Sequence, residues 1–229
     1  MQKLQTVEVA ATENPDGSVI WLHGLGADGH DFEAVVPEMN LPADLDLRFV
    51  FPHAPVRPVT LNGGMAMRAW YDIISLDRDG PADEEGIRQS AAILGSLVEQ
   101  EHDRGVPYAN IVVAGFSQGG AIASHFALRF SQRLAGLMAL STYLPLQGTL
   151  QAEVSDADNA QPADLRIFMA HGTFDPVLPM QLGSASRDTA IALGYSVEWS
   201  EYPMAHAVCP QEIADISRWL GGCFAGDKR

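Results

Sequence analysis

The stretch that decides the fold is Ile111-Val112-Val113-Ala114-Gly115-Phe116-Ser117-Gln118-Gly119-Gly120. Its first four residues are small or β-branched and apolar, which predicts a buried strand. Gly-x-Ser-x-Gly follows, and a helical pattern then runs over 121–130. In that context the serine lies at a sharp strand-to-helix turn, with its hydroxyl exposed above the sheet. Ser117 is therefore the candidate nucleophile, the alternative being a glycine-rich turn without chemistry.

Composition places the chain among globular proteins and restricts its partners. It has 229 residues, of which 47% are hydrophobic, and we expect one α/β domain over 1–229. The formal net charge of −15 disfavours nucleic acid and anionic membrane surfaces. No apolar run has signal-peptide or membrane-helix length, so we expect no stable membrane insertion and a cytoplasmic location. Two cysteines, Cys209 and Cys223, are expected to be free thiols.

Apolar strands alternate with amphipathic helices along the whole chain. Strands are expected at 6–11, 18–22, 47–51, 111–114, 134–140, 165–170 and 195–202, and helices at 81–102, 121–130, 180–193 and 210–220. The turn signal at 14–17 predicts that the first two strands form a hairpin. The prolines of 52–58 predict an extended loop, and polar 147–163 a surface loop. The alternation predicts an α/β fold with a mostly parallel central sheet and helices on both faces.

Acyl transfer requires two N–H donors for the oxyanion, one after the nucleophile and one from an earlier strand-to-helix loop. The first would be Gln118. The second strand leads into His23-Gly24-Leu25-Gly26-Ala27-Asp28-Gly29, whose glycines let backbone amides face inward. Leu25 is the candidate for the second amide, although the same residues could form only a tight turn. His23 is expected to support this loop rather than to transfer protons.

Chain order selects the partners of the serine, because this architecture places Ser, then Asp or Glu, then His, at strand ends. Four of the seven histidines precede Ser117, and His125 lies eight residues along the following helix. His171 comes before any suitable acid, which leaves His206 after the last strand. Among the intervening acids, only Asp175 follows a buried strand by a short loop. Each residue alone could be structural, Asp175 as a helix cap and His206 as a loop histidine.

An apolar segment at 61–76 has neither helical nor strand periodicity. It can pack on the core, or it can wall a groove for an acyl chain, where methionines adapt to varied shapes. The candidate groove residues come from this segment and from the acid loop, by which we mean the loop that carries Asp175. They are Leu61, Met65, Trp70, Ile73, Val177 and Leu178.

These motifs together resemble the α/β-hydrolase carboxylesterases grouped with acyl-protein thioesterases and lysophospholipases, and most closely the bacterial carboxylesterases of that family. The likeness covers almost the whole chain and includes 23–29, Pro52-His53-Ala54-Pro55, Trp70-Tyr71-Asp72, 115–120, His171-Gly172-Thr173-Phe174-Asp175-Pro176-Val177 and Met204-Ala205-His206. The resemblance implies a Ser117, Asp175, His206 triad, oxyanion amides from Leu25 and Gln118, and an apolar acyl site. Phe174 departs from the small polar residue common there in the family.

The function expected from these features is a serine carboxylesterase that hydrolyses short-to-medium-chain esters of small molecules through an acyl-enzyme. The alternatives are an acyl-protein thioesterase or lysophospholipase with the same triad, and, less well supported, a binding protein that keeps the fold without activity. The chemistry requires no cofactor, and no metal-ligand spacing is present. The oligomeric state stays open, with a homodimer as one alternative.

Overall fold

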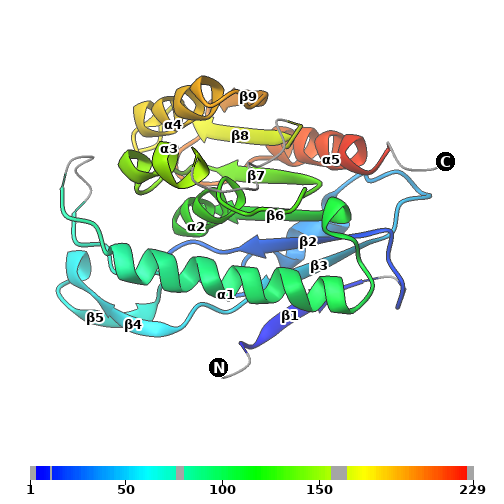
Figure 1. The fold of residues 1–229 in the computed structure, drawn as a ribbon, viewed down its shortest axis with the longest axis horizontal. Coiled ribbons are helices and arrows are strands. Elements are labelled where there is room, and N and C mark those ends of the chain that lie inside the picture. The colour runs from blue at the N-terminus through cyan, green and yellow to red at the C-terminus, as the bar shows by residue number, and fades with distance from the viewer. Residues whose placement is uncertain (1–3, 11, 76–79, 156–163, 226–229) are drawn as a thin grey trace.

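The computed structural model describes residues 4–10, 12–75, 80–155 and 164–225. Its centre is a seven-stranded sheet with the order β1-β3-β2-β6-β7-β8-β9, which Figure 1 shows from β1 at the bottom to β9 at the top. The strands are β1 Thr6–Val9, β2 Gly17–Leu22, β3 Leu47–Pro52, β6 Ile111–Phe116, β7 Gly136–Leu140, β8 Ile167–Gly172 and β9 Val197–Tyr202. Only β1 is antiparallel to its neighbour. The predicted mostly parallel sheet is confirmed.

Helices cover both faces of this sheet, as the sequence predicts. One face carries α1 Glu84–Asp103, α2 Gln118–Ala127, α3 Gln147–Ser155 and α4 Met180–Ala192, and the other carries α5 Pro210–Phe224 and the 3-10 helix η1 Glu33–Glu38. The long helix α1 crosses in front of the sheet in Figure 1. Its predicted apolar face is the buried one, because Ile87, Leu94 and Val98 are almost inaccessible to solvent. Further 3-10 helices are η2 Thr60–Asn62 and η3 Tyr108–Asn110.

The predicted hairpin between the first two strands is wrong. β1 pairs with β3, from Thr6 opposite Pro52 to Val9 opposite Phe49, whereas β2 lies between β3 and β6 and is parallel to both. The turn before β2 is hydrogen-bonded to the segment before β3 instead. The Asp16 amide donates to Asp46 O, and the Asp46 amide donates to Asp16 Oδ2. Because both edges of β2 are occupied, β1 cannot pair with β2 and adds to the edge of β3 instead.

Two segments expected to be irregular contain regular structure. The predicted loop over 52–58 and the apolar segment at 61–76, which has no helical or strand periodicity, hold an antiparallel pair outside the main sheet, β4 Val56–Val59 and β5 Met65–Arg68. The polar segment from 147 begins with α3, which buries Leu150 and whose Glu153 accepts hydrogen bonds from Arg88 and Arg129. Tertiary contacts therefore support a helix whose own pattern is weak. Residues 156–163 and 76–79 lie outside the described part of the chain.

Candidate active site

Ser117 occupies the strand-to-helix turn that the sequence predicts. It follows β6 directly and is the N-cap residue of α2, with φ 53° and ψ −121°, a region that serine rarely adopts. Glycine is required on either side because the backbone is so close. A Cβ on Gly115 would lie 2.3 Å from Gly119 C, and one on Gly119 would lie 2.4 Å from Leu22 O. This crowding holds the serine in its strained turn.

The loops after β8 and β9 bring the two expected partners to this serine. His206 Nε2 lies 2.9 Å from Ser117 Oγ, and His206 Nδ1 lies 2.6 Å from Asp175 Oδ2. The Asp175 side chain is fully buried, whereas that of His206 is 16% exposed. The three side chains therefore form one hydrogen-bonded row, in which the imidazole can accept the serine proton while the carboxylate holds its other nitrogen.

His171 is a neighbour of Asp175 that the sequence reasoning set aside. Its ring is fully buried at the end of β8, with Nε2 2.8 Å from Leu178 O and 3.5 Å from Asp175 Oδ2. Burial lowers the pKa of His171, so the ring is neutral and Nε2–H donates to Leu178 O. His171 thereby fixes the loop that carries Asp175. The His-Gly motif at the strand end was the signal for this role.

The loop expected to provide an oxyanion amide lies against the nucleophile turn. A Cβ on Gly24 would lie only 3.4 Å from Ser117 Cβ, which places Leu25 in the next position of that loop. Gln118 is the first residue of α2, and the first N–H groups of a helix have no intrahelical acceptor. His23 supports the loop as expected: Nδ1 bonds Gly24 O at 2.7 Å and Nε2 accepts from the Ala54 amide at 3.0 Å.

The side chain of Gln118 has a structural role that the sequence did not reveal. Its Oε1 accepts from the Trp70 amide at 2.8 Å, and its Nε2 donates to Tyr71 O at 2.8 Å. The indole N–H of Trp70 donates to His23 O at 2.9 Å. These bonds tie the segment after β5 to both of the loops that surround Ser117.

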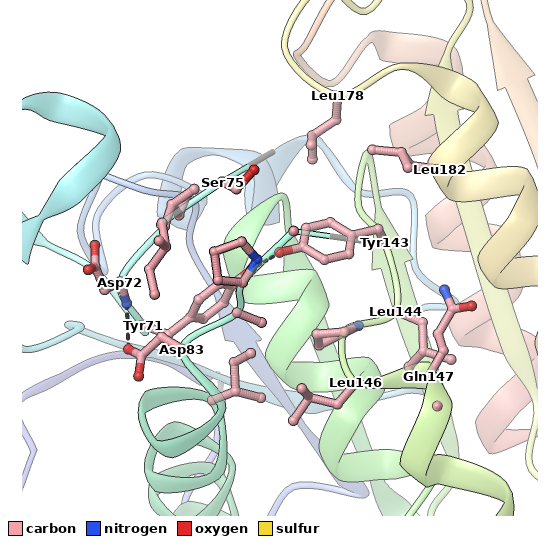
Figure 2. A pocket seen from close by; sticks show the side chains of 18 of the residues that line it. Tyr71, Asp72, Ser75, Asp83, Tyr143, Leu144, Leu146, Gln147, Leu178 and Leu182 are labelled. Carbon is pink, nitrogen blue, oxygen red and sulfur yellow. Dashed lines mark hydrogen bonds between the residues drawn. The ribbon is translucent and has the colours of Figure 1, made fainter. Parts of the chain in front are cut away.

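A pocket of about 360 Å³ lies beside the row of catalytic candidates, and Figure 2 shows the side chains that line it. Three contacts connect it to them. Tyr71 O is bonded to Gln118, the Leu178 amide donates to Asp175 Oδ1, and Thr142, next to the pocket residue Tyr143, donates to Ser117 O. The wall of the pocket is thus bonded to residues next to Ser117 and to Asp175, although Ser117, Asp175 and His206 are not themselves among its lining residues.

The predicted groove residues divide between this pocket, the surface and the core. Ile73 and Leu178 line the pocket. Leu61, Met65 and Val177 are 47%, 65% and 49% exposed and are not among its lining residues, and neither is Phe174 at 71%. Trp70 is fully buried in the core, so the prediction that it lines the groove is wrong. Its apolar ring packs there because its one polar atom has an acceptor in His23 O.

Comparison with known proteins identifies the family of this chain. A family model described as phospholipase/carboxylesterase matches residues 4–223. The chain belongs to the phospholipase/carboxylesterase family. Its architecture is accordingly that of an α/β-hydrolase, as the resemblance implied.

Two proteins similar in sequence to this phospholipase/carboxylesterase family member come from fungi. Acyl-protein thioesterase 1 of Neurospora crassa is 39% identical over 219 residues, covering 93% of this chain and 89% of that protein. Acyl-protein thioesterase 1 of Cryptococcus neoformans is 36% identical over 234 residues, covering 95% and 96%. The crystal structure of Zea mays acyl-protein thioesterase 2 superimposes with a TM-score of 0.86 at 29% identity, covering 96% of this chain and 99% of that one.

Within the described residues, no three or more His, Cys, Asp or Glu side chains are grouped so that they could hold a metal ion. No helix in the same part of the chain has the length and apolar character needed to cross a membrane. Cys209 and Cys223 are free and half-buried.

Proposed function

We propose that this protein is a serine hydrolase that cleaves acyl thioesters, and also carboxylic esters, through an acyl-enzyme on Ser117. The observation that carries the proposal is the hydrogen-bonded row Ser117–His206–Asp175 beside an apolar pocket. A nucleophile, a base and an orienting acid at these distances are the parts that covalent acyl transfer requires.

The reaction follows from the positions of these atoms. His206 Nε2 removes the Ser117 proton while Oγ attacks the acyl carbonyl carbon, and Asp175 holds the Nδ1–H and stabilises the imidazolium. The imidazolium then protonates the leaving thiolate or alkoxide as its bond to carbon breaks. Water, deprotonated by the same imidazole, attacks the acyl-enzyme and releases the carboxylic acid and free Ser117.

We assign the oxyanion to the backbone amides of Leu25 and Gln118. Negative charge develops on the carbonyl oxygen in each tetrahedral intermediate, and preorganised N–H donors stabilise it. The support for this assignment is the position of Gln118 at the start of α2 and the close approach of Gly24 to Ser117. The N-terminus of α2 also favours negative charge at this point.

The relatives favour the thioester over the short-to-medium-chain carboxylic ester that the sequence led us to expect. Both fungal relatives are named acyl-protein thioesterases and are 36% to 39% identical over nearly the whole chain. The family description, phospholipase/carboxylesterase, keeps an ester hydrolase as the second candidate. A binding protein without activity is the least supported class, because all three side chains of the row are present and bonded.

Labelling and a substrate panel test the proposal together. A fluorophosphonate probe should label the wild-type protein once and Ser117→Ala not at all, and kcat should fall on the order of 10⁶-fold in that variant. Ser96→Ala, on α1 with its hydroxyl bonded to Ala92 O, is the matched control. A palmitoyl thioester, p-nitrophenyl esters and a lysophospholipid should be compared by kcat/KM. Labelling that persists in Ser117→Ala would contradict the assignment, and a preference for the oxygen esters would favour the second candidate.

A further inference from the structure

Two tyrosine hydroxyls meet at the wall of the pocket. Tyr71 follows β5 and Tyr143 follows β7, and their hydroxyl oxygens lie 2.8 Å apart although the residues are 72 positions apart in the chain. Figure 2 shows Tyr71 and Tyr143 among the side chains of the pocket wall. Tyr71 is only 3% exposed, and both residues line the pocket. This polar pair is thus built into a largely apolar cavity.

One hydroxyl proton of the pair has no acceptor within the pair. Two hydroxyls carry two protons, and their mutual hydrogen bond uses one of them. Neither hydroxyl has another acceptor among the described residues. Burial raises the pKa of Tyr71 well above its usual value and also raises that of Tyr143, so both groups stay protonated. The second proton is therefore a buried donor available to whatever occupies the pocket.

The rest of the lining restricts the charge of that occupant. Most of it is apolar and includes Ile73, Ile74, Leu144, Leu146 and Leu182. Asp72 and Asp83 are the carboxylates in the wall, and both are already engaged, Asp72 by the amide and hydroxyl of Thr60 and Asp83 by the Asp72 and Gly86 amides. No described lining residue is Lys, Arg or His. An anionic group would meet two carboxylates without a cation, whereas a neutral oxygen would meet only a donor.

We propose that this pocket receives an acyl chain that carries a neutral oxygen, as a keto, hydroxyl or ether group, and that the Tyr71–Tyr143 pair donates a hydrogen bond to it. The inference rests on the proposed function, because it takes the pocket as the acyl site of Ser117. A plain alkyl chain would displace water from the pair and leave a buried donor without an acceptor. We expect this to lower kcat/KM about tenfold. The tyrosine pair is thus a positioning and specificity element for the acyl group.

A chain-matched set of p-nitrophenyl esters tests this specificity. It comprises acetate, octanoate, oxo-octanoates with the keto group moved one carbon at a time, and the octanedioate monoester. With the wild-type protein, one oxo-octanoate should exceed octanoate in kcat/KM by about tenfold, because its oxygen reaches the pair. The octanedioate monoester should be the poorest of the long esters. Octanoate equal to or better than every oxo-octanoate would overturn the inference.

Tyrosine variants test whether the pair is the cause. In Tyr71→Phe/Tyr143→Phe the ratio of the best oxo-octanoate to octanoate should fall to about one, since both hydroxyls are gone. Tyr71→Phe alone leaves one hydroxyl proton and should keep part of the preference. Tyr108→Phe, which removes a hydroxyl that donates to Glu99, is the matched control and should keep all of it. A ratio that stays near ten in the double variant would contradict the proposal.

The same set separates this inference from the proposed function. If acetate and all longer esters and the palmitoyl thioester are left intact by the wild-type protein, the proposed hydrolase activity itself is wrong. If acetate and octanoate are hydrolysed but the keto group makes no difference, only the assignment of the tyrosine pair is wrong. The wild-type ratios give this answer even if the double variant does not fold.

Discussion

Asp175 faces His206 with one carboxylate oxygen only, Oδ2, at 2.6 Å from Nδ1. The other oxygen, Oδ1, accepts hydrogen bonds from the amides of Val177 at 2.8 Å and Leu178 at 2.9 Å. The two amides fix the rotation of the carboxylate, so that the oxygen presented to the imidazole is always the same one. Because a carboxylate oxygen only accepts, Oδ2 holds the imidazole proton on Nδ1 and leaves Nε2 free to accept the serine proton.

This relationship predicts the effect of Asp175→Asn. The Val177 and Leu178 amides would hold the new amide oxygen, so the NH₂ group would face His206 Nδ1 as a donor. The imidazole would then keep its proton on Nε2 and could not accept the serine proton, and we expect kcat to fall about 10⁴-fold. Thermal unfolding should hardly change. Asp188→Asn, at an exposed ion pair with Arg187, is the control, and activity within tenfold of wild type in Asp175→Asn would contradict the assigned role.

Gly119→Ala should disturb the site through the backbone alone. The added methyl group would lie 2.4 Å from Leu22 O and 2.6 Å from His23 O, and neither carbonyl can move without shifting the end of β2. We expect a lower melting temperature and a loss of about 100-fold in kcat/KM, because a small displacement of Ser117 and Gln118 misaligns the attack. Gly222→Ala near the end of α5, where the nearest atom to the new Cβ is Arg166 Nη1 at an ordinary contact distance of 3.4 Å, should behave like wild type. Equal behaviour of the two variants would show that the close approach at Gly119 is not required.

Trp70→Ala should act on stability rather than on chain-length preference. The ring is fully buried and its N–H bonds His23 O, so its removal should cost about 3–5 kcal/mol and lower the melting temperature by about 10 °C. Losses in kcat should be similar for acetate and octanoate esters. Trp70→Phe, which keeps a ring but loses the N–H, should be intermediate. A selective loss for octanoate would place Trp70 in the acyl wall after all.

The buried carboxyl of Glu212 should make the stability of the fold depend on pH. It is fully buried near the start of α5, and burial raises its pKa to about 8 even though the backbone amide of Cys209 acts in the opposite direction. A carboxyl whose pKa is higher in the folded than in the unfolded state stabilises the fold at low pH. That contribution is full below about pH 4.5 and is lost as the pH rises through about 8.

Glu212→Gln should remove this dependence, because the amide stays neutral at every pH. Urea unfolding measured across this range should show wild-type stability falling toward alkaline pH more steeply than that of the variant, and the variant should be the more stable of the two above about pH 8. Glu38→Gln, at an exposed carboxyl, is the control and should keep the wild-type slope. Parallel pH profiles for wild type and Glu212→Gln would show that this carboxyl is not the cause.

Local sequence determined the elements whose signal lies within a few neighbouring residues. The strand and glycines around Ser117 predicted the turn that the structure contains, since only glycine permits the approach of β6 to α2. Chain order and strand ends also selected His206, which the structure bonds to Ser117, and Asp175, which it bonds to His206, because parallel strands collect their carboxyl ends at one edge. The alternation of strands and helices likewise predicted the sheet and its two covered faces.

Long-range packing decided the strand pairing and side-chain neighbours that local sequence patterns do not encode. The edge of the sheet to which β1 adds depends on which edges are already occupied, and the turn before β2 carries no information about β3. Trp70 and Tyr71 are adjacent in one apolar segment, yet one packs in the core and the other lines a pocket opposite Tyr143. Hydrophobicity predicts that such side chains leave water, but their neighbours are set only when distant segments pack against one another.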